Sequence, residues 1–333
     1  MSTLRQDPTT DEWVILAPER AARKPFDCPT RPPVPARDPG CAFCPGNEHL
    51  TPPEIHRSPA VGPWEQRIVP NRFPALSGGK DTERTGHRLA REMPGVGAHE
   101  VVIESPDHDQ RLDDMTPDRV SGVVAAWRER YRFLAGQPWA RAIVVFKNFG
   151  ERAGTTLEHP HSQVVATPVV PPDALHRYSV ASRYYDDTGH SVYLDVLERE
   201  LDEGTRLLTV RGRFGAIVPF AGHVPYETWI VPRTLQPSFG QLRDEDLADV
   251  AVLLRDIVAA LRRTMDDPDY NVVVQSAPIG QELAPAFLWH LRILPRLVTT
   301  AGFELGSGMS INCVPPEAAA ASLRAALAIV PTS

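Results

Sequence analysis

The chain has 333 residues, enough for one large domain or two ordinary ones with a sizeable core. Its 42% hydrophobic and 23% charged residues are typical of a folded, water-soluble protein, and a net charge of -7 without a long basic run argues against a nucleic-acid partner. Since no apolar run reaches the roughly 18 residues of a membrane span and the N-terminus lacks a signal pattern, we expect a cytoplasmic protein without a membrane partner.

Prolines are concentrated between positions 25 and 63 of the chain. This composition predicts extended, proline-rich segments and ordered loops that lie over the body of the protein. Cys41 and Cys44 form a CxxC pair inside the region. In a long chain with four cysteines, such a pair is more typical of half a metal site than of a disulfide framework. A redox pair or two buried thiols are the alternative interpretations.

The stretch from residue 100 to residue 168 contains a short series of predicted elements. They are a strand at 100–103, a helix at 117–134, a strand at 142–146 that leads to Asn148, and a strand at 161–167. The last strand is apolar and β-branched from Val164 onward, which favours extended structure.

The segment His159-Pro160-His161-Ser162-Gln163 opens that last strand. On a strand, residues i and i+2 share a face about 6.5 to 7 Å apart, so the two imidazoles and the amide should point the same way. Pro160 fixes its own φ and favours extended geometry at His159. A chance pair of strand histidines is the alternative. The residues that precede the motif speak against it, namely Asn148, Gly154 and Thr156.

An imidazole can attack a phosphorus atom and later leave it, which splits a difficult substitution into two easier steps. We assign this nucleophilic role to His161. Gln163 can donate hydrogen bonds to phosphate oxygens but cannot deliver a proton. The leaving group should therefore need no acid, which is true of a sugar phosphate because its second ionisation lies at about pH 6. Transfer of a nucleotide between phosphates fits this pattern better than hydrolysis.

A second series of elements repeats the first. It has a strand at 227–230, a helix at 244–262 with apolar residues at helical spacing, and strands at 270–274 and 288–295. Glu100 and Glu227 are separated by the same interval as Pro168 and Pro295, which indicates a duplication. The sequence therefore predicts an α+β protein of two halves, residues 1–170 and 171–333. The second half lacks the nucleophile, and His290 in it is either a structural or a functional histidine.

These residues resemble the galactose-1-phosphate uridylyltransferase family, part of the histidine-triad superfamily, over nearly the whole chain. Segments 5–14, 18–23, 105–108 and 302–308 resemble further signatures of that family. The resemblance implies a duplicated histidine-triad-like (HIT-like) fold, in which each half has an antiparallel sheet with covering helices. It also implies a homodimer that works in galactose metabolism.

The resemblance implies one structural zinc ion held by Cys41, Cys44, His108 and His159. Two thiolates and two imidazoles also make a closed tetrahedral set, which is how structural zinc is usually bound. Residues implied to bind the substrates are Arg23, Asn71, Asn148, Gly154, Thr156, Gln163 and Glu304. Family members with a second metal site use further histidines, where this chain has Gln275 and Arg292 beside His290, so a second metal is doubtful.

The implied activity is transfer of UMP from a UDP-sugar to a sugar 1-phosphate, by a ping-pong reaction through a covalent His161-nucleotide. Segments 146–148 and 275–278 also resemble the branch that contains ADP-glucose phosphorylase, so phosphorolysis of ADP-glucose by inorganic phosphate is an alternative. A dinucleoside polyphosphate phosphorylase or hydrolase is another enzymatic alternative. A non-catalytic, zinc-stabilised nucleotide-binding protein is the alternative of a different class.

Overall fold

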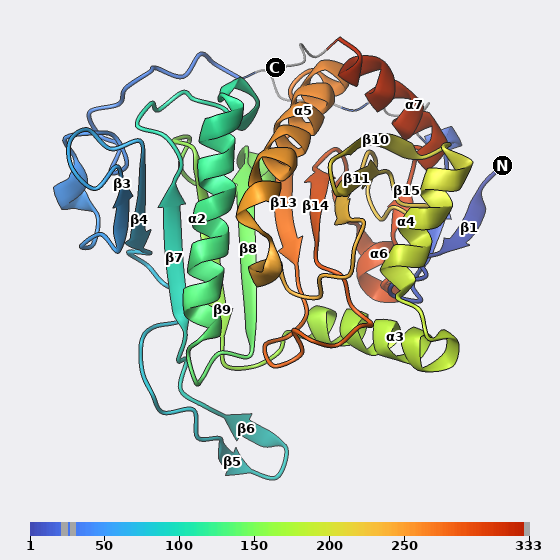
Figure 1. Ribbon diagram of the computed structural model, residues 1–333, viewed down its shortest axis with the longest axis horizontal. Helices are drawn as coiled ribbons and strands as arrows, with labels where there is room; N and C mark the ends of the chain where they lie inside the picture. The colour runs from blue at the N-terminus through green and yellow to red at the C-terminus, as the bar shows by residue number, and fades with distance from the viewer. Residues whose placement is uncertain (21–25, 27–30, 330–333) are drawn as a thin grey trace.

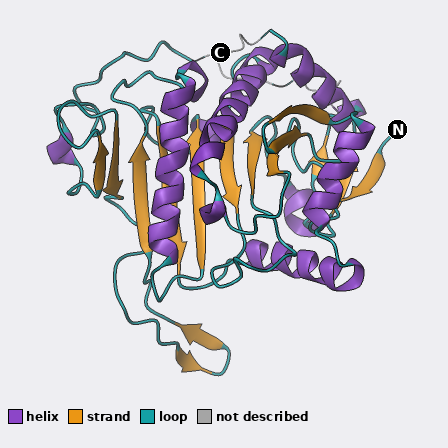
Figure 2. Ribbon diagram, viewed as in Figure 1, coloured by secondary structure: helices purple, strands orange, loops and turns teal. Residues whose placement is uncertain are grey.

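A large antiparallel sheet forms the centre of the computed structural model, which describes residues 1–20, 26 and 31–329 (Figures 1 and 2). Strands from both halves of the chain contribute to this sheet. In spatial order the strands are β10 (Leu207–Arg211), β11 (Phe214–Ile217), β12 (Thr228–Pro232), β14 (His290–Pro295), β13 (Tyr270–Gln275), β8 (Ala142–Phe149), β9 (His161–Thr167), β7 (Ala98–Ile103), β4 (Gln66–Pro70) and β3 (His56–Ser58).

Two long helices, α2 (Pro117–Ala135) and α5 (Leu247–Met265), cover one face of this sheet side by side (Figure 1). Thr116 caps α2 by accepting a hydrogen bond from the Arg119 amide, and Pro117 occupies the first turn, where its missing N–H costs nothing. Buried side chains of both helices and of every second residue in the central strands form one core. On β9, for example, Val164 and Ala166 are buried, whereas Gln163 and Val165 on the opposite face are half-buried.

The strand order is symmetric about the pair β8 and β13. Moving outward, β8, β9, β7, β4 and β3 from the first half mirror β13, β14, β12, β11 and β10 from the second, and α2 mirrors α5. The α+β class is therefore confirmed. The strands predicted at 100–103, 142–146, 161–167, 227–230, 270–274 and 288–295 correspond to β7, β8, β9, β12, β13 and β14.

Other elements surround the sheet. A small sheet joins β1 (Thr3–Gln6), β2 (Trp13–Leu16) and β15 (Ile311–Asn312), and short helical turns lie at Glu48–Leu50, Leu112–Asp114, Glu151–Ala153, Phe239–Gln241 and Asp244–Asp246. The remaining helices are α3 (Pro172–Thr188), α4 (Val192–Glu203), α6 (Gly302–Ser307) and α7 (Pro316–Leu327). Our sequence analysis did not predict α3 or α4. Over residues 31–55 the chain has one short helical turn and no strand, as the prolines predicted.

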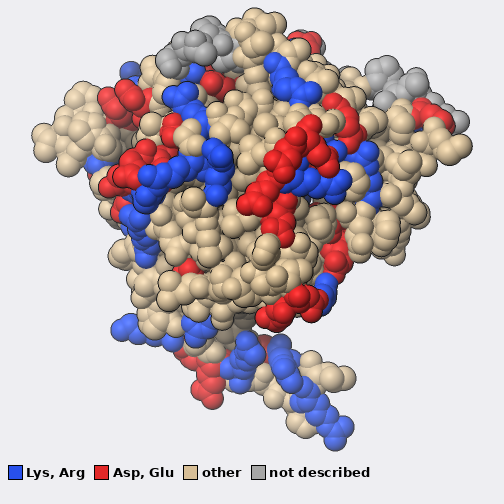
Figure 3. All heavy atoms as spheres, turned by 45° about the vertical axis from the view of Figure 1, so that its right-hand side comes forward, with Lys and Arg blue, Asp and Glu red and all other residues tan. Residues whose placement is uncertain are grey.

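The hairpin of β5 (Thr85–His87) and β6 (Ala90–Glu92) projects from the body (Figure 1). On the face shown in Figure 3, basic and acidic side chains are interspersed over the body, and basic atoms are prominent on the projecting hairpin. In the part of the chain that the structure describes, no helix combines the length and the apolar run that crossing a bilayer requires.

A buried ion pair links the three central strands of the first half. Lys147 Nζ on β8 lies 2.6 Å from Glu104 Oε2, just after β7, and 3.2 Å from the carbonyl oxygen of His161 at the start of β9. Both side chains are almost completely buried. The second oxygen of Glu104 has no hydrogen-bond partner, so this carboxylate depends on Lys147 alone for its compensation.

We predict that Lys147→Met lowers the free energy of unfolding by about 3 to 5 kcal/mol, because it leaves Glu104 as an uncompensated buried charge. The double variant Lys147→Met/Glu104→Leu should recover most of that loss, since an apolar pair replaces the ion pair. Urea unfolding at pH 7 measures both. Lys80→Met, which changes an exposed lysine, is the matched control and should shift stability by less than about 0.5 kcal/mol. A loss as small as that in Lys147→Met would contradict this role.

Candidate active site and metal centre

Two buried thiols and two buried imidazoles come together where the proline-rich segment meets the start of β9. Cys41 and Cys44 lie on a turn closed by the Cys44 amide, which donates to the Cys41 carbonyl. His108 follows β7, and His159 lies two residues before the start of β9. Their nitrogen and sulfur atoms all lie within 4.8 Å of one another, and all four residues are buried. The structure thus brings together the four residues named as metal ligands.

The geometry of this cluster fits a tetrahedral ion. The Cys44 Sγ lies 3.5 Å from His108 Nδ1 and 3.7 Å from His159 Nδ1, and the two Nδ1 atoms are 3.3 Å apart. A tetrahedral ion with bonds of about 2.0 to 2.3 Å separates its ligand atoms by roughly 3.3 to 3.8 Å. The backbone amide of Phe43 donates a hydrogen bond to Cys41 Sγ, and that of Asp38 donates one to Cys44 Sγ.

The His159 ring is oriented for such a site. Its Nε2 lies 2.7 Å from the Ser105 carbonyl oxygen, which can only accept, so Nε2 carries the proton and Nδ1 turns its lone pair toward the cluster. A carbonyl partner of this kind is typical of metal-bound histidines. Burial lowers the pKa of His159 to about 4, which keeps the ring neutral and able to act as a ligand.

His161 is the first residue of β9, and its ring is held in one tautomer. Its Nδ1 lies 2.8 Å from the His159 carbonyl oxygen and must therefore carry the proton. The lone pair is then on Nε2, which no backbone group occupies in the described structure. Burial lowers the pKa of His161 and favours the neutral ring. A neutral imidazole with a free Nε2 lone pair is the form that can attack an electrophile.

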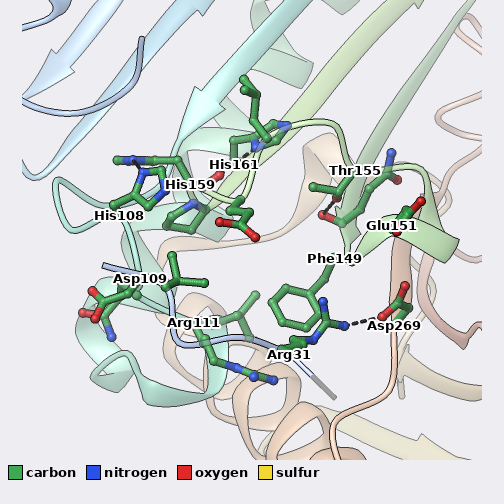
Figure 4. Close-up of a pocket in the computed structure, with 18 of the residues that line it drawn as sticks. Arg31, His108, Asp109, Arg111, Phe149, Glu151, Thr155, His159, His161 and Asp269 are labelled. Carbon is green, nitrogen blue, oxygen red and sulfur yellow. Dashed lines mark hydrogen bonds and ion pairs between the residues drawn. The ribbon is translucent and has the colours of Figure 1, made fainter. Parts of the chain in front are cut away.

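His161 lines a pocket of about 740 Å³, a volume suited to a nucleotide-sized ligand (Figure 4). The wall opposite the histidines is charged: the guanidinium groups of Arg31 and Arg111 lie 4.4 and 4.6 Å from the Phe149 ring centroid. Arg31 pairs with Asp267 and Asp269, and Arg111 also pairs with Asp267. Sequence reasoning did not identify this wall, because its residues come from segments far apart in the chain.

The loop between β8 and β9 forms one side of the pocket. Asn148, Thr155 and Thr156 line it, and Gly154 takes a left-handed φ of 88° beside Asn148. Gly150 also has a positive φ, and a Cβ atom there would lie 2.3 Å from the Asp269 carboxylate. Asp269 in turn accepts a 2.6 Å hydrogen bond from the Arg152 amide. The second half of the chain therefore holds this loop in place.

The remaining predicted binding residues are more scattered. Gln163 lies one pleat beyond His161 and contacts His99, which in turn contacts Asn71. Glu304 does not line the pocket of His161: its carboxylate accepts hydrogen bonds from the amides of Ala301 and Ile311 near its own helix. Arg23 lies outside the described residues. Asn148 and Thr156 thus line the pocket of His161, and Gly154 lies in the same loop. Gln163, Asn71 and Glu304 are not among the residues that line this pocket.

His290 occupies a different environment in the second half. It is completely buried against the rings of Trp229 and Tyr193, and burial lowers its pKa to about 3. Arg292, two residues further along β14, bonds to the buried carboxylate of Glu227. The Arg292 guanidinium beside His290 disfavours a second cation there.

Comparisons with known proteins match the whole length of the chain. The family model for the galactose-1-phosphate uridyl transferase N-terminal domain matches residues 1–171. ADP-glucose phosphorylase of Arabidopsis thaliana is 35% identical, covering 96% of this chain and 92% of the relative. Galactose-1-phosphate uridylyltransferase of Thermotoga maritima is 29% identical, with 97% and 98% covered.

Solved structures agree. The crystal structure of the Arabidopsis thaliana ADP-glucose phosphorylase with bound ADP-glucose has a TM-score of 0.83 at 31% identity, covering 97% of this chain and 98% of that chain. A uridylyltransferase structure has a TM-score of 0.76 at 28% identity, with 98% and 99% covered. With its fold, its histidine motif and its full-length relatives in accord, this chain belongs to the galactose-1-phosphate uridyl transferase family.

Proposed function

We propose that the protein is a ping-pong nucleotidyltransferase that uses a nucleotide sugar as donor and His161 as nucleophile. The observation that carries this proposal is the fixed tautomer of His161, whose free Nε2 lone pair lies in the pocket beside the loop of Asn148 and Gly154. Family membership supports the same reaction class.

In the first step, the Nε2 lone pair of His161 forms a bond to the α-phosphorus while the bond from that phosphorus to the bridging oxygen breaks. The leaving group is a sugar 1-phosphate, which takes the bond electrons without needing a proton. In the second step, a phosphate oxygen of the acceptor attacks the same phosphorus and His161 leaves. Asn148, Thr156 and Gln163 would donate hydrogen bonds to the non-bridging oxygens, and each donor can contribute about 3 to 4 kcal/mol to the transition state.

The donor and acceptor of the main proposal are a UDP-sugar and a sugar 1-phosphate, as the uridylyltransferase relatives suggest. A second candidate is ADP-glucose with inorganic phosphate as acceptor. One observation favours it: the Arabidopsis ADP-glucose phosphorylase is 35% identical, compared with 29% for the Thermotoga uridylyltransferase. Asn71 and Arg23 are retained as proposed contacts to the nucleotide, and a cytoplasmic homodimer is retained as the proposed state.

The proposed division of labour follows the duplication. Residues 1–170 would carry the metal centre and the nucleophile, and residues 171–333 would support the pocket through Asp269 and Asn271. We propose that the Cys41, Cys44, His108 and His159 cluster holds a structural zinc ion, because its donor set is closed and tetrahedral. The ion would fix the segment that leads into β9.

We predict that the purified protein contains one zinc ion per chain and that Cys44→Ser loses it, together with several kcal/mol of stability. Metal content by plasma mass spectrometry and thermal unfolding with and without a chelator measure the effect. Cys313→Ser is the matched control, since Cys313 is a buried thiol outside the cluster. Full zinc content in the Cys44 variant would overturn the assignment.

We also predict a covalent adduct when the protein is exposed to UDP-glucose or ADP-glucose without an acceptor. Intact-mass spectrometry should show the gain of one uridylyl or adenylyl unit, which identifies the base. His161→Ala should show no gain, and Gln163→Ala should form the adduct about 100-fold more slowly or worse. His176→Ala, a histidine on α3, serves as the control. An adduct in the His161 variant would disprove the nucleophile assignment.

A further inference from the structure

A row of polar side chains crosses the sheet on the face that α2 and α5 leave uncovered. Asn71 follows β4, His99 lies on β7, Gln163 on β9, Asn148 on β8 and Asn271 on β13. The strand order β13, β8, β9, β7, β4 makes these strands neighbours. Asn271 and Asn148 are register partners, and the pairing of Phe146 with Gln163 sets Asn148 opposite His161. Two amides in this row, Asn148 and Gln163, are proposed to bind phosphate. Asn148 contacts Asn271, and Gln163 contacts His99.

The orientation of the Asn148 amide follows from a backbone carbonyl. The Ala153 oxygen can only accept, and Asn271 Nδ2 lies 2.9 Å from it, so Asn271 turns its NH2 group toward Ala153. The same NH2 group donates to Asn148 Oδ1 at 2.8 Å. The oxygen of Asn148 is therefore bound by the protein. Its NH2 group lies beside Gly154, in the loop that lines the His161 pocket.

The orientation of the Gln163 amide follows from a backbone N–H. The Ala75 amide donates to His99 Nδ1 at 3.1 Å, so this nitrogen carries no proton and the neutral ring is protonated at Nε2. Nε2 lies 2.7 Å from Gln163 Oε1 and donates to it. Asn71 Nδ2 also lies 3.0 Å from Nε2, but the Phe73 amide donates to Asn71 Oδ1, so this contact joins two donors and is not a hydrogen bond. Gln163 thus keeps its NH2 group free.

From these two chains of hydrogen bonds, we propose that His99 and Asn271 are positioning residues for nucleotidyl transfer, and the proposal rests on the function proposed above. Each holds an amide with its oxygen toward the protein and its NH2 group available to the transferred phosphoryl group. The two orientations of an amide have nearly the same shape, so packing alone does not choose between them. Without its partner, the amide can present an oxygen to a negatively charged phosphate, which is repulsive.

This arrangement gives the second half a defined part in the reaction. Asn271 comes from β13 and reaches across to the first half, where it holds both Asn148 and the Ala153 carbonyl. Donors that are already oriented need no rearrangement when charge builds on the non-bridging oxygens, which is the basis of electrostatic preorganisation. Neither His99 nor Asn271 is in contact with the reacting atoms in this scheme, and each acts through one amide.

The test is a double-mutant cycle on the rate of adduct formation, measured by intact mass at saturating nucleotide sugar. The donor is whichever of UDP-glucose and ADP-glucose labels the unsubstituted protein. His99→Phe keeps a ring without a donor and should slow labelling about 10- to 100-fold, the effect of losing one hydrogen bond to a charged group. His99→Gln, which can place an N–H near the same point, should recover much of the rate.

The decisive comparison is in the Gln163→Ala background. There His99→Phe should cause no further loss beyond about twofold, because the amide through which it acts is gone. If His99 had only a general structural role, the rate losses of His99→Phe and Gln163→Ala would multiply in the double variant, and that result would overturn the proposal. His176→Phe is the matched control, because this exposed histidine contacts the Thr10 carbonyl oxygen, does not line the pocket of His161 and should leave labelling at the normal rate.

Asn271→Asp provides an independent arm with an isosteric side chain. Its carboxylate cannot donate, so Asn148 should turn its NH2 group toward residue 271 and away from the pocket. Labelling should then slow about 10- to 100-fold. In the Asn148→Ala background, Asn271→Asp should cause no further loss. Normal labelling in both Asn271→Asp and His99→Phe would overturn this inference alone. Absence of an adduct in the unsubstituted protein would instead overturn the proposed function, and this inference with it.

Discussion

The site depends on the antiparallel register of three neighbouring strands, β13, β8 and β9. Because side chains alternate between the two faces of a sheet, this register aligns Asn271, Asn148 and His161 on the uncovered face. A slip by one residue would turn them into the core beneath α2 and α5 and expose valines instead. Those valines are almost completely buried, namely Val145, Val164, Val272 and Val274, so the hydrophobic effect opposes any slip.

His159 connects the candidate metal cluster to His161, the proposed nucleophile, through two different atoms. Its ring contributes Nδ1 to the cluster, and its carbonyl oxygen accepts the Nδ1 proton of His161. On the opposite face of the strand, Trp127 Nε1 of α2 donates to Ser162 Oγ at 2.6 Å. The start of β9 is thereby held from both sides. Such restraint keeps the His161 ring in one tautomer and one orientation. In-line attack on a phosphorus atom, the reaction proposed for His161, requires a nucleophile that is held in this way.

The two halves of the duplication have taken different parts in the site. The first half carries the histidine motif, the thiols and the loop that lines the pocket. The second half carries a buried His290 packed among aromatic rings, yet it supplies Asp269 and Asn271, which bond to the loop of the first half. The arginines over Phe149 extend this support, since their carboxylate partners Asp267 and Asp269 also come from the second half. A single pocket therefore needs both halves.

The sequence by itself determined the α+β class, the internal repeat, the CxxC pair and the HPHSQ motif, because these are local patterns in which spacing sets which face a side chain occupies. It did not reveal α3 and α4, the charged wall of the pocket, or the contacts of His99 and Asn271. A lone histidine carries no motif, and the place of Asn271 in the repeat did not show which group it contacts. Their partners lie 64 and 123 residues away, and only strand order and register bring them within hydrogen-bond distance. Tertiary structure also decided which atom of each amide and each ring faces the pocket. Backbone groups from distant segments make that choice, because a backbone N–H can only donate a hydrogen bond and a backbone carbonyl can only accept one.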